Sequence, residues 1–237
     1  MEGYILVVDL LGFSNIIENS SDEKLLLRIS DWVQLINDVA AKSEITKHQL
    51  ISDTVFAAVE SNPESFGALV NFARQLLQEG IKRSFPIRGA ISHGLFEWGK
   101  LIYGKAVIKA HKLEMSQNWI GITCDHQLPH LDGLWGINSV ICYPPPMKSG
   151  LISVHPVISW DVPEFTSLVR YLTKGGLIKD GELIGWEWAE KVNNTVQFGM
   201  YRCFLQRQGI SGHHFHGILP IQVLSQEGLT RESSEDA

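Results

Sequence analysis

Two aspartates stand where their surroundings favour carboxylate chemistry. Asp9 ends the apolar run of residues 4–8 (YILVV), where an ionised carboxylate is costly unless a cation or hydrogen-bond donors meet it. Asp53 stands at the tip of a tight hairpin predicted over residues 47–60, whose first strand we expect beside the strand of residues 4–8. The two carboxylates would then converge and bind Mg²⁺ or Mn²⁺, the cations of phosphoryl chemistry. Taken singly, each aspartate also fits a turn or a helix cap.

The turn after Asp9 has the features of a phosphate cradle. Residues 10–14 contain Gly12 and open a predicted helix, so their backbone amides point toward a bound anion. Near the end of the chain, His213 and His216 are candidate metal ligands. No cysteine or acidic residue nearby completes that site, and a solvated loop is the favoured interpretation.

The elements that position these residues follow from periodicity and capping signals. A capping box at Ser20 and Glu23 predicts one helix, and Asn62 followed by proline predicts a second that runs to about Lys82. Further predicted elements are a strand at 86–94, a helix around 106–113, strands at 120–124 and 138–143, and a helix near 186–207. The order predicts an α+β fold, the ferredoxin-like βαββαβ arrangement with C-terminal additions.

Composition bounds the class of protein. The 237 residues are 44% apolar with a net charge of -6, which fits a globular protein and disfavours nucleic acid or an anionic membrane as the main partner. No apolar run is long enough to span a bilayer, and three scattered cysteines suit a reducing compartment, so a cytoplasmic location is predicted. The triple proline at 144–146 marks a break. We predict a catalytic core over 1–143, an elaboration packed on it over 144–225, and a flexible tail over 226–237.

Four segments in order resemble the signature segments of class III nucleotidyl cyclases. They are residues 9–14 (DLLGFS), 51–56 (ISDTVF), 88–94 (RGAISHG) and 104–114 (GKAVIKAHKLE). The resemblance covers roughly residues 4–125 and implies a homodimer with shared active sites. It implies metal binding by Asp9, Asp53 and the backbone carbonyl of Leu10. It also implies phosphate binding by a further set: Leu11, Gly12, Phe13, Ser14 and Arg88.

The chain departs from this family at the ribose and transition-state positions. An asparagine and an arginine of the family are replaced by Ile108, which forms no hydrogen bond, and Lys112, which is a point charge. We expect the helix with Lys112 to pack on a different edge from the aspartates, so that Lys112 serves the partner's site. Arg88, Lys105 and Lys109 are alternative phosphate cations.

Base selection departs from the family as well. The positions that read purines hold Gln49 and Leu101, and glutamine offers both a donor and an acceptor for uracil or cytosine. The short chain as a whole most resembles the stand-alone bacterial pyrimidine cyclases of an antiphage system. That resemblance implies a manganese-dependent homodimer (Mg²⁺ being the alternative ion) that makes cyclic UMP or cyclic CMP and activates a separate effector. Substrate frequency in that family favours UTP over CTP.

Two other functions stay open at this stage. One is a purine cyclase with unusual base contacts. The other is a non-catalytic, cyclase-like nucleotide sensor, which Ile108 and Lys112 favour and the two retained aspartates disfavour.

Overall fold

Strands and helices alternate along the described part of the chain. The structure is a computed structural model that describes residues 1–174, 178–179, 182–183 and 186–210. In chain order the elements are β1 (Glu2–Leu10), α1 (Phe13–Asn19), α2 (Asp22–Lys42), β2 (Lys47–Ile51), β3 (Thr54–Glu60), α3 (Pro63–Lys82), β4 (Ile87–Trp98), β5 (Ile102–Gly104), α4 (Lys105–Ser116), β6 (Gly121–Cys124), η1 (Leu131–Leu134), β7 (Val140–Tyr143), β8 (His155–Ile158), α5 (Phe165–Lys174), β9 (Ile178–Lys179), β10 (Glu182–Leu183) and α6 (Trp186–Arg207).

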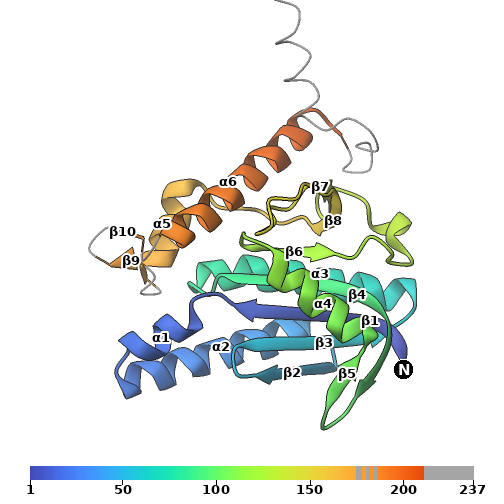
Figure 1. Cartoon of the computed structure of the whole chain (residues 1–237), viewed down its shortest axis with the longest axis horizontal. Helices are drawn as coiled ribbons and strands as arrows, with labels where there is room; N and C mark the ends of the chain where they lie inside the picture. Colours follow the sequence, from blue (N-terminus) through green and yellow to red (C-terminus); the bar gives the residue numbers. More distant parts are fainter. Residues whose placement is uncertain (175–177, 180–181, 184–185, 211–237) are drawn as a thin grey trace, which may run out of the picture.

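A mixed sheet of eight strands forms the centre of the molecule, with α4 in front of it and α3 behind it in Figure 1. Its order is β2-β3-β1-β4-β6-β8-β7, and β5 pairs with β4. β1 lies between β3 and β4 and is antiparallel to both. The predicted α+β, ferredoxin-like arrangement is therefore confirmed. One expectation is wrong: the second hairpin strand, β3, lies beside β1, and the first, β2, forms the edge.

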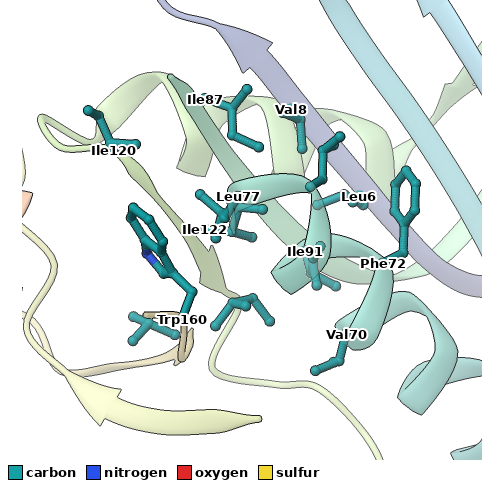
Figure 2. Packing of buried hydrophobic residues seen from close by; sticks show 14 of the residues in the cluster. Leu6, Val8, Val70, Phe72, Leu77, Ile87, Ile91, Ile120, Ile122 and Trp160 are labelled. Carbon is teal, nitrogen blue, oxygen red and sulfur yellow. The ribbon is translucent and has the colours of Figure 1, made fainter. Parts of the chain in front are cut away.

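Both faces of β1 are buried, which explains its continuous apolar run. Alternate residues point to opposite faces of a strand, and here they enter two separate hydrophobic clusters. Leu6 and Val8 belong to the larger cluster, together with Phe72 of α3 (Figure 2). Ile5 and Val7 belong to a smaller cluster beneath α4. The sheet is thus covered by α2 and α3 on one face and by α4 on the other.

One predicted helix start is confirmed and the other is wrong. The Asn62 side chain accepts a hydrogen bond from the Ser65 amide at 2.8 Å, and α3 begins at the following proline as expected. The predicted capping box at Ser20 does not form. The N-cap of α2 is Ser21, whose side chain makes no capping hydrogen bond. The reason is the short helix α1, which ends at Asn19 and makes Ser20 its own C-cap.

The segment after residue 143 joins the central sheet. β8 lies between β6 and β7, pairing with β7 along four residues and with β6 at one register position. The long helix expected near 186–207 is confirmed as α6, and its Thr195 hydroxyl accepts a hydrogen bond from the Ile120 amide beside β6. The domain bounds remain predictions, while β8 shows that the sheet itself crosses the proposed boundary. Residues 213–216 and 226–237 lie outside the described residues.

None of the helices among the described residues combines the length and the apolar character that crossing a bilayer requires.

Candidate active site

The two predicted metal aspartates meet at one end of the sheet. Asp9 is opposite Thr54 in the β1–β3 register, so it lies next to the tip of the hairpin that contains Asp53. The Leu10 amide donates a hydrogen bond to the Asp53 backbone carbonyl at 3.2 Å, which ties the hairpin tip to the end of β1. At that tip Ser52 adopts a left-handed conformation with φ of 59°. The main chain therefore holds both aspartates in place without help from their carboxylates.

Asp9 points toward the α4 side of the sheet, since it follows Ile5 and Val7 in the alternation of β1. Its pKa is raised to about 6, first by burial and then by the nearby carboxylates of Glu114 and Asp53, while Arg88 and His111 oppose the rise. Three carboxylates therefore share one small region of the structure. Such an excess of negative charge favours a bound cation.

Arg88 is buried and already bonded. Its Nε donates to the Glu114 carboxylate at 2.6 Å, and its Nη1 donates to the Gln117 backbone carbonyl at 3.0 Å. Its Nη2 lies 3.8 Å from a carboxylate oxygen of Asp9. Phosphate binding by Arg88 remains a prediction, and it requires the guanidinium to share these partners with the ligand. In the structure Arg88 links the last turn of α4 to the end of β1.

The predicted phosphate cradle begins α1. Gly12 is the N-cap of α1 in a left-handed conformation, with φ of 80°, and its carbonyl accepts a hydrogen bond from the Ile16 amide at 3.1 Å. The Leu11 amide donates to the Pro86 carbonyl at 2.9 Å, so this amide already has a partner. Phe13 is half-buried against the large cluster, and Ser14 is exposed. Gly12, Phe13 and Ser14 thus remain the candidates for backbone contact with phosphate.

The sequence suggested that the helix with Lys112 packs on a different edge of the sheet from the aspartates, and this expectation is wrong. α4 lies across β1 and β4, and its last turn brings Glu114 to Arg88 beside Asp9. Lys112 itself faces elsewhere. Its side chain lines a cavity on the β6 side of α4, and Ile108, one helical turn earlier, is 55% exposed. Within one chain, the structure does not bring Lys112 to the aspartate pair.

The predicted base-reading residues lie toward the α4 side and the β4–β5 loop. His48 contacts the Asn37 side chain of α2 at 3.1 Å, so the next residue, Gln49, points to the opposite, α4 side. Gln49 is opposite Phe56 in the β2–β3 register and is partly exposed. Leu101 is 74% exposed in the loop between β4 and β5. Both residues are open to a ligand or to a second chain.

The donor set at Asp9 and Asp53 fits a hard divalent cation. Carboxylate oxygens suit Mg²⁺ and Mn²⁺, which keep several waters and need few protein ligands. Among the described residues, no group of three or more His, Cys, Asp or Glu side chains is placed to hold a metal. A site made of two carboxylates, backbone oxygen and water is therefore the arrangement that these residues support.

Sequence reasoning missed Glu114, Gln117 and His111. Glu114 follows Ala106 and Ala110 at intervals of four on the buried face of α4, and a charged residue at such a core position signals a buried partner. Gln117 accepts hydrogen bonds from Trp119 at 2.7 Å and Thr123 at 2.6 Å, and it donates to two carbonyls. This network fixes the end of α4 against β4 and β6.

The fold is shared with adenylyl and guanylyl cyclase domains. The adenylyl cyclase CyaB from P. aeruginosa is 14% identical, with a TM-score of 0.50, over 67% of this chain and 94% of that chain. The guanylyl cyclase domain of the RhoGC fusion protein from the aquatic fungus Blastocladiella emersonii is 16% identical, with a TM-score of 0.52, over 67% of this chain and 95% of that chain. The catalytic core of a rhodopsin-guanylyl cyclase with converted specificity, in complex with ATPαS, is 16% identical, with a TM-score of 0.54, over 67% of this chain and 95% of that chain.

No protein-family model and no curated protein matches the sequence. The likeness to solved structures therefore establishes the fold: the chain has the mixed α+β fold of adenylyl and guanylyl cyclase domains.

Proposed function

We propose that this protein is a nucleotidyl cyclase that converts a pyrimidine nucleoside triphosphate to its 3′,5′-cyclic monophosphate and diphosphate. One observation carries the proposal. Asp9 and Asp53 meet at one end of the sheet, in a fold shared with adenylyl and guanylyl cyclase domains. A surplus of carboxylates around Asp9 adds to it, because phosphoryl chemistry needs a divalent cation at such a place.

In the proposed reaction the 3′-oxygen bonds to the α-phosphorus while the bond from that phosphorus to the diphosphate oxygen breaks. The 3′-hydroxyl proton passes to water. A divalent cation on Asp9 and Asp53, Mn²⁺ or alternatively Mg²⁺, supplies positive charge and lowers the pKa of the 3′-hydroxyl when bound. Backbone amides of residues 12–14 hold phosphate oxygens, and Lys112 of the partner protomer offsets charge on the α-phosphate.

Gln49 is the proposed reader of the base. Its amide offers a donor and an acceptor, which match O4 and N3–H of uracil or N3 and N4–H₂ of cytosine. Its position on the α4 side of the sheet, partly exposed, supports this role. Leu101 supplies no polar contact, as expected of a site that does not read a purine edge. UTP is the favoured substrate and CTP the alternative.

The proposed biological role follows from the resemblance to antiphage pyrimidine cyclases. The enzyme acts in the cytoplasm as a homodimer, and each site takes its aspartates from one chain and Lys112 from the other. Its cyclic nucleotide product is a second messenger that activates a separate effector after phage infection. The exposed row formed by Ile108 and Lys112 on α4 supports a dimer of this kind, because it faces away from the chain's own aspartates.

The test is incubation of the pure protein with each of the four nucleoside triphosphates and Mn²⁺, followed by separation of the products. Cyclic UMP or cyclic CMP, absent with the Asp53→Ala variant, is the expected result. Cyclic AMP or cyclic GMP alone would replace the proposal with a purine cyclase. Nucleotide binding without any cyclic product would favour the sensor, which the replacement of the ribose contact by Ile108 motivates.

A further inference from the structure

A cavity lies on the flank of α4 that faces β6, on the far side of the helix from Asp9. Its volume is about 490 Å³, within the range of small-ligand sites. Lys109 and Lys112 of α4 line it together with Asp125 and His126, which follow β6, and His155 at the start of β8. We call it the Lys112 cavity. It is built where β8 enters the sheet between β6 and β7.

The Lys112 cavity carries surplus positive charge. Lys109 Nζ lies 3.5 Å from a carboxylate oxygen of Asp125, so Asp125 balances the charge of Lys109. The positive charge of Lys112, which lines the same cavity, is then in excess. The pair with Asp125 places the Lys109 ammonium group at the wall of the cavity. A cavity of this size with cationic walls is suited to a small polyanion.

Two stacked histidines form one wall of the cavity. The rings of His126 and His155 are stacked, with their centroids 3.8 Å apart. His155 is buried, and its Nδ1 donates to the Cys124 carbonyl at 3.2 Å, since a carbonyl oxygen only accepts. His126 is exposed and contacts the Ser153 hydroxyl at 3.3 Å through Nε2. The stack therefore holds His126 at the opening of the cavity, beside the lysines.

We infer that the Lys112 cavity is the subsite for the two terminal phosphates of the nucleotide held by the partner's aspartates. This inference rests on the proposed function, in which Lys112 meets the α-phosphate of that nucleotide. Because Lys112 lines this cavity, the groups nearest an anion at its ammonium group include Lys109 and His126. Lys109 and His126 then meet the β- and γ-phosphates, and after the α-phosphorus–oxygen bond breaks the same groups hold the departing diphosphate.

The kinetic test compares Lys109→Met, Lys109→Arg and His126→Gln with Lys42→Met, an exposed lysine at the end of α2 on the other face of the sheet. Lys109→Met should raise both the KM for the nucleotide and the inhibition constant of diphosphate about tenfold, since hydrogen bonds to charged groups are of this strength. His126→Gln should raise both by less, Lys109→Arg should restore most of the binding, and Lys42→Met should match the wild type. Circular dichroism checks that each variant is folded.

Two results would overturn the inference in an active enzyme. One is an unchanged KM and an unchanged diphosphate inhibition constant in both Lys109→Met and His126→Gln. The other is diphosphate inhibition that depends on Lys109 yet is not competitive with the nucleotide, because that pattern places the anion outside the substrate site.

A second measurement separates this inference from the proposed function. If the wild type makes no cyclic product, calorimetric titration of the metal-free protein with inorganic diphosphate still probes the cavity. Binding that is lost in Lys109→Met and kept in Lys42→Met retains the cavity as a diphosphate site although the cyclase proposal has failed. Equal binding by both variants, or none by the wild type, overturns the inference as well.

Discussion

Arg88 and Glu114 form a buried ion pair between β4 and α4, with the Arg88 Nη2 2.6 Å from a Glu114 carboxylate oxygen. Both side chains are almost fully removed from solvent. The Arg88 guanidinium also lies beside Asp9. The pair therefore joins α4, the helix that carries Lys112, to β4 beside Asp9, the proposed metal ligand.

Glu114→Gln should destabilise the fold by about 3–5 kcal/mol, because removing one partner leaves the buried guanidinium without its counter-charge. Urea unfolding followed by circular dichroism measures the free energy of unfolding. Glu79→Gln is the matched control: Glu79 pairs with Lys82 at the surface of α3, and its loss should change stability by less than about 0.5 kcal/mol. Equal effects of the two variants would contradict a structural role for the buried pair.

Asp53→Ala should lower turnover at least about a hundredfold while leaving the fold intact. The side chain is only partly buried, and the Asp53 carbonyl that accepts from the Leu10 amide is main chain, so the variant keeps that contact. Product analysis with Mn²⁺ and the nucleotide measures the loss. Circular dichroism and thermal unfolding are the controls. If the variant turned over at more than roughly a few per cent of the wild-type rate, Asp53 would not be a metal ligand.

Mn²⁺ should stabilise the protein more at about pH 7.5 than at about pH 5. The folded-state pKa of Asp9, about 6, is above its ordinary value of 3.8, so the folded protein binds the extra proton between these values. The contribution of Asp9 to stability is therefore full below its ordinary pKa and falls as the pH rises through about 6. A cation on the ionised carboxylate offsets this loss. Thermal unfolding with and without Mn²⁺ measures the effect.

Asp9→Asn is the control for this pH dependence. It should abolish the Mn²⁺-induced rise in Tm at both pH values, because the neutral amide lacks the charge that attracts the ion. A rise in Tm that is the same at the two pH values in the wild type would show that Asp9 does not hold the metal.

Gln49→Ala should raise the KM for the preferred pyrimidine nucleotide and weaken discrimination among the four nucleotides. One hydrogen bond to a base edge is worth about 0.5–1.5 kcal/mol, which corresponds to a change of several-fold. Steady-state kinetics with each nucleotide measures the change, and Lys47→Ala, on the same strand, is the comparison. An unchanged specificity profile would place base reading elsewhere, for example in the β4–β5 loop of residues 99–101.

A mixture of Asp53→Ala and Lys112→Ala protein should recover activity that neither variant has alone. Lys112→Ala should lower kcat roughly 10²–10³-fold. A mixed dimer has one site with both defects and one with none. Random exchange makes about half the dimers mixed, so recovery should approach about a quarter of wild type. No recovery, with subunit exchange shown by differential tagging, would mean that one chain builds the whole site or that Lys112 is not part of it.

The local elements and the aspartate pair were predictable from the sequence because their signals lie within short stretches of chain. The apolar run before Asp9 specifies a strand buried on both faces, and Asn62 followed by proline specifies the start of α3. The short link at residues 52–53 specifies a hairpin. Once these elements are in a ferredoxin-like order, Asp9 and the tip of the hairpin come to the same end of the sheet.

Only the tertiary structure decided which hairpin strand lies beside β1, where β8 enters the sheet, and what Arg88 contacts. Each of these depends on the pairing of segments that are distant in sequence, and several pairings satisfy the same local pattern. Glu114 and His126 illustrate the point: their surroundings are supplied by β4 and by β8. Hydrophobic periodicity identifies the elements of this protein, but the partners of its buried charges exist only after those elements have packed together.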